Sequence, residues 1–392
     1  MSEDFRTRLR GAHSPATSIE PDRKKPGPQP GVALCLSGGG YRAMLFHLGA
    51  IIRLNETAKL RSLKRVSTVS GGSIVGAILG LHWNSLRFKD AVAENLLSEV
   101  VEPTRTIASR TLDAPNILKG LFLPGAINRY VTRAYDRMLF HGATLQDLPA
   151  ESEGPMFVIN STSLQSGALW RFTRPYMADY LVGRIPNPRI PLAVAVAASS
   201  AFPPFLSPAR LKLSPRDFIP DKECPLQHEP FTTRAVLSDG GVYDNLGLET
   251  AWKKCRTVLV SDAGGHMESQ GKPCRDWAFQ SFRVLDVIDN QVRSLRKRQA
   301  IGAFIDPEDE HDGTYWGIRS DITNYDLPNT LPGPLDKTMT LARVATRLKK
   351  LDSVTQDRLI NWGYAICDAA LRKHVDPGLP APKSFPLPGG VG

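Results

Sequence analysis

The sequence predicts an α/β layered fold built around a largely parallel sheet, because one pattern occurs twice near its start. A short apolar run, a glycine cluster and an apolar helical stretch follow one another over residues 32–54 and again over 66–83. Repetition of strand, glycine turn and helix is typical of units whose strands run parallel in one sheet. The elements further along the chain fit the same layered arrangement.

Later apolar runs predict four more strands, at 157–160, 235–238, 257–261 and 315–318. Residues 88–148 are expected to form an inserted helical segment that prolines divide into pieces. An amphipathic helix is expected over 277–301, because Leu285, Ile288, Val292 and Leu295 recur at steps of three or four, and a last helix over 354–373.

The chain is expected to hold one main domain between two irregular ends. Residues 1–31 predict a flexible arm, since five prolines fall within 14–31 without apolar periodicity. The main domain then spans 32–375, with 277–373 as its C-terminal helical part. Residues 376–392 are again rich in proline and glycine and predict an irregular tail.

Composition excludes several classes of protein. With 42% hydrophobic and 22% charged residues in 392, the chain is an ordinary globular one. No apolar run reaches the roughly 18 to 20 residues of a membrane-spanning helix. The N-terminus lacks a secretory h-region, so we expect a cytoplasmic protein. Five scattered cysteines without a C-x-x-C pair predict neither a disulfide framework nor a zinc site.

The formal net charge of +10 predicts attraction to polyanions or to anionic membrane surfaces. No nucleic-acid-binding motif occurs, so nucleic acid is not an expected partner. A peripheral membrane surface is the expected one. The basic run 293–298 is one candidate contact, although such a run can also be an ordinary solvated helix face. The apolar segment 121–123 is the other, although it can also be the end of a core helix.

The first glycine cluster lies directly between a predicted strand and a helix. Gly38, Gly39 and Gly40 carry no Cβ, so their backbone N–H groups can point together at one anion at the positive end of the helix. An oxyanion or a phosphate would fit equally well. The spacing from Gly38 to Ala43 also matches the loose dinucleotide-binding pattern, with Glu56 as a possible ribose partner.

A serine-containing turn follows the second predicted strand. Ser73 has Gly71 two residues before it, and Ser70 has Gly72 two residues after it, so each meets half of the nucleophile-elbow pattern. We expect Ser73 to be the nucleophile, because the apolar helix starts directly behind it and a helix N-terminus stabilises an alkoxide. Ser70 is the alternative, and a serine-capped turn is the purely structural interpretation.

A third glycine-flanked turn supplies a carboxylate. Asp239 ends a predicted strand and precedes Gly240 and Gly241, so little crowding prevents its approach to another turn. A nucleophilic serine needs a proton acceptor, and Asp239 is the expected one. A plain Asp-Gly turn is the structural alternative.

In this order, the Ser-Gly-Gly-Gly-x-Arg segment 37–42, the Gly-x-Ser turn and the Asp-Gly-Gly turn resemble the bacterial-type patatin-like phospholipases, which are related to the catalytic domains of cytosolic phospholipase A2. Residues 197–205 are similar to a further segment of that family, so the resemblance covers about residues 32–265. It implies a three-layer α/β/α sandwich. It also implies a lipid acyl hydrolase with a serine-aspartate dyad and no cofactor or metal.

The resemblance implies a role for each motif residue. Ser73 would be the nucleophile, Asp239 the general base, and Gly38–Gly40 with Arg42 the oxyanion loop. Arg42 would support either the loop or the charge. The substrate would be a phospholipid, a lysophospholipid or another acyl ester, cleaved through an acyl-enzyme. Because an ordinary aspartate, with a pKa of about 4, is a weak base, we expect the site to raise its basicity.

Other interpretations stay open at this stage. Asp262 precedes another glycine pair and is a second candidate base, and His266 would complete a Ser-Asp-His triad in the chain order of α/β-hydrolases. His47 is expected to be packed in the interior. A different class of function would be a non-catalytic lipid- or nucleotide-binding regulator that keeps the fold.

Overall fold

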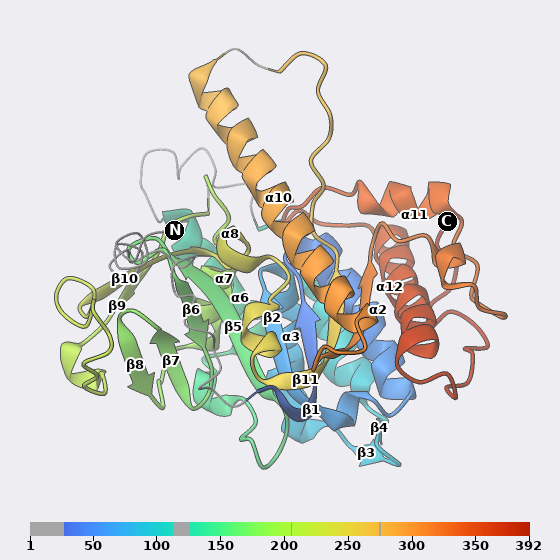
Figure 1. The fold of residues 1–392 in the computed structure, drawn as a ribbon, viewed down its shortest axis with the longest axis horizontal. Helices are drawn as coiled ribbons and strands as arrows, with labels where there is room; N and C mark the ends of the chain where they lie inside the picture. The colour runs from blue at the N-terminus through green and yellow to red at the C-terminus, as the bar shows by residue number, and fades with distance from the viewer. Residues whose placement is uncertain (1–26, 113–125, 205, 274–275) are drawn as a thin grey trace, which may run out of the picture.

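A computed structural model describes residues 27–112, 126–204, 206–273 and 276–392. Most of the expected N-terminal arm and the apolar segment 121–123 therefore lie outside the described residues. Within the described chain, ten strands form one mixed sheet, which confirms the α/β fold (Figure 1).

One side of this sheet, from its β12 edge inward, is parallel, as predicted. Its strands follow the order β12 (Asp312–Gly317), β11 (Cys255–Asp262), β1 (Gln29–Leu36), β2 (Leu63–Val69) and β5 (Met156–Ser163). Beyond β5 the neighbours run antiparallel, in the order β6 (Leu169–Phe172), β7 (Tyr176–Asp179) and β8 (Gly183–Pro186). A second antiparallel pair, β10 (Arg234–Asp239) and β9 (Ala209–Lys212), joins at the end of β5.

Helices cover both faces of the sheet. Leu34 and Leu36 of β1 belong to the core shared with α2 (Gly40–Glu56), α3 (Gly71–His82) and α12 (Ser353–His374). The alternate residues Ala33 and Cys35 belong to a second core, beneath α9 (Glu249–Trp252) and the end of α10 (Trp277–Ile305). Because side chains of a strand alternate between faces, β1 is buried on both sides. The three-layer arrangement follows from these two cores.

The segment expected to be a helical insertion contains a hairpin as well. Strands β3 (Phe88–Lys89) and β4 (Val92–Ala93) pair around Asp90 and Ala91, which have φ of 49° and 65°. Helices α4 (Glu102–Ala108) and α6 (Ala126–Tyr135) follow on either side of the residues that are not described. No helix of the described chain is long and apolar enough to cross a bilayer.

α2 and α12 approach each other backbone to backbone. A Cβ added to Gly49 would lie 1.9 Å from the carbonyl oxygen of Ile360, and one added to Gly363 would lie 1.8 Å from that of Phe46. Glycine at both crossing points allows this closeness. The last long helix is therefore packed directly against the helix that begins at the glycine cluster.

We expect Gly363→Ala to lower the free energy of unfolding by about 3 kcal/mol, because the added methyl group forces the helices apart. Gly302→Ala is a matched control in α10, since a Cβ at Gly302 meets nothing within 4 Å. It should leave stability unchanged or raise it by up to about 1 kcal/mol. Urea unfolding of both variants gives the comparison, and equal midpoints would contradict the close crossing.

Candidate active site

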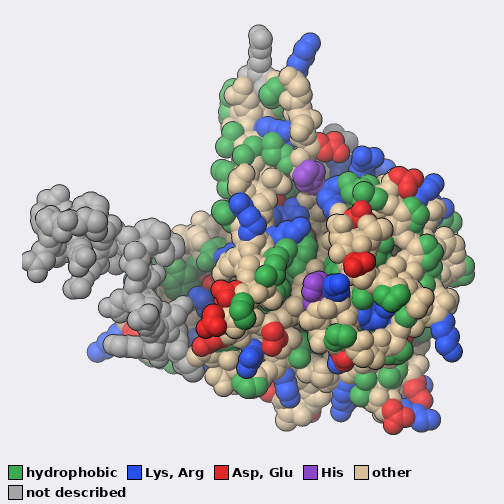
Figure 2. Space-filling view, turned by 45° about the vertical axis from the view of Figure 1, so that its right-hand side comes forward, with side chains coloured by type: hydrophobic (Ala, Val, Ile, Leu, Met, Phe, Trp, Pro, Cys, Tyr) green, Lys and Arg blue, Asp and Glu red, His purple; other side chains and the backbone are tan. Residues whose placement is uncertain are grey.

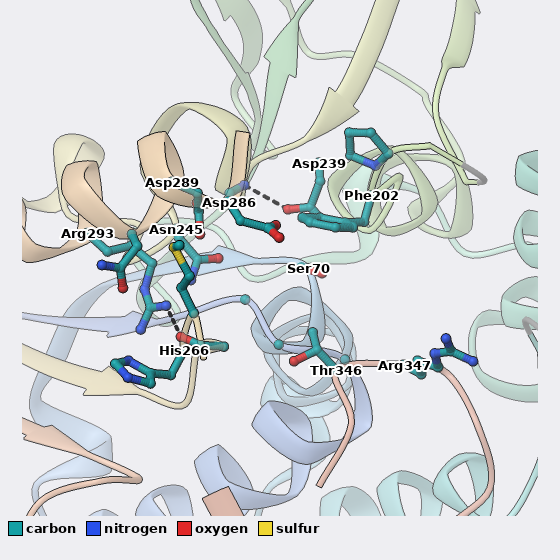
Figure 3. A pocket seen from close by; sticks show the side chains of 18 of the residues that line it. Ser70, Phe202, Asp239, Asn245, His266, Asp286, Asp289, Arg293, Thr346 and Arg347 are labelled. Carbon is teal, nitrogen blue, oxygen red and sulfur yellow. Dashed lines mark hydrogen bonds between the residues drawn. The ribbon is translucent and has the colours of Figure 1, made fainter. Parts of the chain in front are cut away.

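The three glycine-flanked turns meet at one cavity of about 490 Å³ (Figure 3). Its lining includes the glycine loop, Ser70 and Asp239, together with residues 202–204, 265–268 and 346–348 and one side of α10. Adjacent parallel strands β1 and β2 end here, which brings two of the turns together. The carboxyl ends of parallel strands are where α/β folds place their ligand sites.

The glycine loop leads into α2 with its backbone exposed to the cavity. Gly39 and Gly40 have φ of 145° and 60°. A Cβ on either would lie 2.6 Å from a backbone oxygen, of Ala263 and Arg347 respectively, so neither position has room for a side chain. Because α2 begins at Gly40, its first N–H groups have no carbonyl one turn earlier in the helix. Such N–H groups can receive an oxyanion.

Ser70 occupies a strained turn between β2 and α3. Its φ of 52° and ψ of −116° are rare for a residue with a side chain and typical of an over-determined functional position. Its N–H donates to Oγ of Ser199 at 3.0 Å, which fixes the turn. A Cβ added to the next residue, Gly71, would lie 2.1 Å from the carbonyl oxygen of Gly40, so the serine turn rests on the glycine loop.

The expectation that Ser73 is the nucleophile needs correction, because Ser73 does not reach the cavity. Its side chain is fully buried, its Oγ donates to Oγ1 of Thr68 at 2.9 Å, and it lies 2.8 Å from Oγ of Ser199. The expectation assumed that the helix starts behind Ser73, whereas α3 starts at Gly71. Ser73 thus lies inside the first helical turn and faces the interior. Ser70, the alternative, takes its place as candidate nucleophile.

Asp239 is buried beside Ser70. Its Oδ1 accepts a hydrogen bond from the N–H of Gly241 at 2.7 Å, whereas Oδ2 has no hydrogen bond from the described residues. Burial raises the pKa of Asp239 to about 7, against the opposing effects of the Gly241 N–H and the Ser70 hydroxyl. This direction is the one that a weak carboxylate base requires.

Arg42 points away from the cavity and ties surrounding segments together. Its guanidinium donates to the carbonyl oxygen of Ala263 at 2.9 Å and to that of Val344 at 2.7 Å. Burial, with a contribution from the charge of Arg319, lowers the pKa of Arg42 to about 10. These contacts support the backbone behind the loop, which is one of the two roles considered for Arg42.

Asp262, the other candidate base, and His266 do not take the position beside Ser70 that Asp239 has. Asp262 accepts a hydrogen bond from the hydroxyl of Tyr315 at 2.7 Å and pairs with Arg293 at 3.5 Å. Burial acts to raise the pKa of Asp262, but the positive charge of Arg293 and the hydrogen bonds outweigh it, so the pKa is lowered. His266 lines the cavity, and Figure 3 shows its ring away from both Ser70 and Asp239. In the described structure no hydrogen bond joins His266 to either of them.

Two further sequence candidates are accounted for by packing. His47 is fully buried and hydrogen-bonded to Oγ of Ser261 at 2.8 Å and to the carbonyl of Ser37 at 3.0 Å, and burial lowers its pKa to about 4. Glu56 accepts from the hydroxyl of Tyr364 at the far end of α2, about 24 Å along the helix from Gly40. It is therefore not a ribose partner for the glycine loop.

Sequence reasoning missed two residues that assemble the turns. Oγ of Ser199, at the end of α7 (Leu192–Ser199), accepts from the N–H of Ser70 and donates to the carbonyl of Asn160 at 2.6 Å. The carbonyl of Asn245 accepts from the N–H of Gly38 at 3.0 Å, and its amide lies against the cavity. Ser199 falls in the segment 197–205 that the resemblance singled out, whereas Asn245 carries no signal in the sequence.

Within the described residues, no group of three or more His, Cys, Asp or Glu side chains is placed to hold a metal ion. The side chains gathered at the cavity are suited to acid-base and nucleophilic chemistry instead, because a hydroxyl, a carboxylate and backbone donors meet there.

Comparisons with known proteins find a matching family and similar folds. A family model described as patatin-like phospholipase matches residues 34–252. The structure of human GIVD cytosolic phospholipase A2 aligns at a TM-score of 0.51 and 12% identity over 86% of this chain and 58% of that one. The same human protein in complex with methyl gamma-linolenyl fluorophosphonate gives a TM-score of 0.50 and 13% identity over 87% and 57%.

At these identities the structural likeness shows a shared fold. This chain spans less than two thirds of the length of those human chains. No curated protein matches its sequence.

The raised pKa of Asp239 predicts a dependence of stability on pH. The folded protein keeps the Asp239 proton up to about pH 7, whereas an unfolded aspartate loses it near pH 4. The contribution of Asp239 to the free energy of unfolding should therefore fall as pH rises from about 4 to about 7, by up to about 4 kcal/mol. Asp239→Asn should lack this fall. Parallel pH profiles of unfolding for the two proteins would contradict it.

Proposed function

Because the chain belongs to the patatin-like phospholipase family, we propose that it is a lipid acyl hydrolase that cleaves fatty acyl esters of phospholipids or lysophospholipids. One observation carries this proposal: Ser70, held in a strained turn, lines the same cavity as the buried carboxylate of Asp239. The glycine loop borders that cavity with backbone donors. A nucleophile, a base and an oxyanion site together define acyl transfer.

The first half of the reaction forms an acyl-enzyme on Ser70. Oγ of Ser70 attacks the ester carbonyl carbon while Asp239 takes the hydroxyl proton. The N–H groups of Gly39 and Gly40 stabilise the negative oxygen that results, as preorganised donors do. The carbon–oxygen bond to the alcohol then breaks, and the alcohol leaves with the proton from Asp239.

Water completes the cycle. Asp239, again unprotonated, takes a proton from a water molecule that attacks the acyl carbon. The bond to Oγ of Ser70 breaks, the fatty acid leaves, and Ser70 recovers the proton. A base with a pKa of about 7 suits this double role, since it both accepts and returns a proton near neutral pH.

The nucleophile assignment is tested by Ser70→Ala against Ser73→Ala, two variants of one turn. Ser70→Ala should reduce kcat/KM for a p-nitrophenyl ester and for mixed phospholipid vesicles by at least about 10³-fold. Ser73→Ala should keep activity within about tenfold, since it loses only internal hydrogen bonds worth about 1 kcal/mol. A dead Ser73→Ala beside an active Ser70→Ala would restore the assignment made from sequence.

The activity of the wild-type protein distinguishes an acyl hydrolase from a non-catalytic regulator. A non-catalytic lipid-binding or nucleotide-binding regulator would hydrolyse no ester under any of these conditions. Turnover that disappears in Ser70→Ala excludes both alternatives.

The base is tested by Asp239→Asn and by His266→Ala. Asp239→Asn removes the proton acceptor and should lower kcat by about 10² to 10⁴-fold, whereas His266→Ala should remain near the wild-type rate. Wild-type kcat/KM should rise with pH through a midpoint of about 7, because the ionised carboxylate is the active form. His266→Ala should keep the same midpoint, and a folded but inactive His266→Ala would establish a triad instead.

A further inference from the structure

The outer half of α10 projects from the body of the molecule, and Arg283 on it donates to the carbonyl oxygen of Glu268 in the preceding loop. The helix spans 29 residues, and its N-terminal end rises out of the body beside the cavity (Figure 1). Figure 2 shows hydrophobic side chains along this projection. The exposed fractions of its largest apolar side chains are 79% for Trp277, 65% for Phe279, 43% for Phe282, 55% for Val284, 56% for Leu285 and 53% for Ile288.

This half of the helix has two different faces. Arg283, Asp286 and Asp289 recur at steps of three and line the cavity. Trp277, Val284 and Ile288 fall on the opposite face, because steps of seven and four residues return to the same side of an α-helix. Trp277, Val284 and Ile288 are therefore turned to solvent, away from the cavity. Phe279 and Phe282 fall on the side of Arg283, Asp286 and Asp289, beyond the part of that side that lines the cavity.

The aromatic side chains gather at the end of the projection. Trp277, Phe279 and Phe282 lie within two turns and point to different sides of the helix. A fluid apolar layer can cover all sides of a helix end, and Trp in particular favours the boundary between lipid headgroups and acyl chains. Arg283 lies directly behind these rings and donates to the carbonyl oxygen of Glu268. A carbonyl oxygen does not neutralise the guanidinium, so its positive charge can still attract a headgroup.

A second copy of the chain fits this surface less well. Leu285, Ile288, Val292 and Leu295 would form the seam of a coiled coil, but they cover only two heptads. Stable coiled coils need three or four. The aromatic end would also remain outside such a seam.

The basic run proposed from sequence is not the better candidate. Arg293 donates to the carbonyl of Gly265 and pairs with Asp262, and Arg296 pairs with Glu249 at 2.9 Å. These charges are compensated within the protein. The other sequence candidate, 121–123, lies outside the described residues.

We propose that the outer half of α10 is a membrane-docking arm, which inserts Trp277, Phe279 and Phe282 into the surface of an anionic phospholipid bilayer. The proposal rests on the proposed function for its assignment of phospholipid as the partner. Arg283 lies about 9 Å along the helix from Trp277 and lines the cavity that contains Ser70. Insertion of the arm would therefore bring the charged wall of the cavity to the level of the headgroups.

The test measures vesicle binding without catalysis, in a Ser70→Ala background. Vesicles of equal parts phosphatidylcholine and phosphatidylglycerol are sedimented with Trp277→Ser/Phe279→Ser/Phe282→Ser, or with the matched control Leu164→Ser/Tyr180→Ser/Ile219→Ser. The control removes three apolar side chains that are 52%, 55% and 46% exposed elsewhere. The arm variant should partition at least about tenfold less than the parent, and the control within twofold of it. Equal losses in both variants, or none, would overturn the proposal.

Two measurements separate this proposal from its alternatives. Vesicles of brominated lipids should quench Trp277 fluorescence, so that Trp277→Phe binds normally with less quenching; unchanged quenching would count against insertion. Sedimentation of the lipid-free protein should show a monomer, and a dimer abolished by the arm variant would identify a second copy as the occupant. With Ser70 restored, the arm variant should hydrolyse a soluble ester at the parent rate, so a failure of the proposed hydrolysis would leave the binding result intact.

Discussion

The contact between Gly71 and the carbonyl of Gly40 is the constraint on which the site depends. A Cβ at Gly71 would lie 2.1 Å from that oxygen, so the two turns meet only as bare backbone. The parallel register of β1 and β2, which pairs Leu36 with Thr68, brings both strands to an end at the same level. Two helices then start side by side, and the N-termini of both point into one space. Positive potential at that point is a consequence of topology before any charged residue is considered.

The carboxylate of Asp239 is positioned by an antiparallel strand and not by the parallel pair β1 and β2. Asp239 ends β10, which runs antiparallel to β5 and pairs Asp239 with Ser161, and its N–H bonds the carbonyl of Ala201 at 2.9 Å. This placement leaves Asp239 almost without solvent, and burial is the main cause of its raised pKa. The same burial that raises the proton affinity of Asp239 destabilises its ionised form. Proton affinity and folding stability are thus coupled at this residue.

Sequence was informative where a pattern is strong and local. Short apolar runs identified the parallel strands, and glycine flanks identified all three turns. The first turn of α3 was missed because glycine and serine carry no apolar periodicity, so the helix was expected to start behind Ser73 and not at Gly71. Strands β6 to β9 have four residues each, too few for a period to show. The pattern of α10 predicted an amphipathic helix correctly, but an amphipathic pattern does not say which face meets solvent.

The glycine-mediated crossing of α2 and α12 bears on where this domain can be divided. The segment that matches the family ends at residue 252, before β11 and α12 begin. β11 pairs with β1 along its length, and α12 covers the helix that carries the glycine loop. A chain cut at 252 would expose one edge of β1 and the apolar back of α2 at the same time, and exposed edges of that kind pair with other chains. The segment that matches the family is therefore smaller than the packed body to which it belongs.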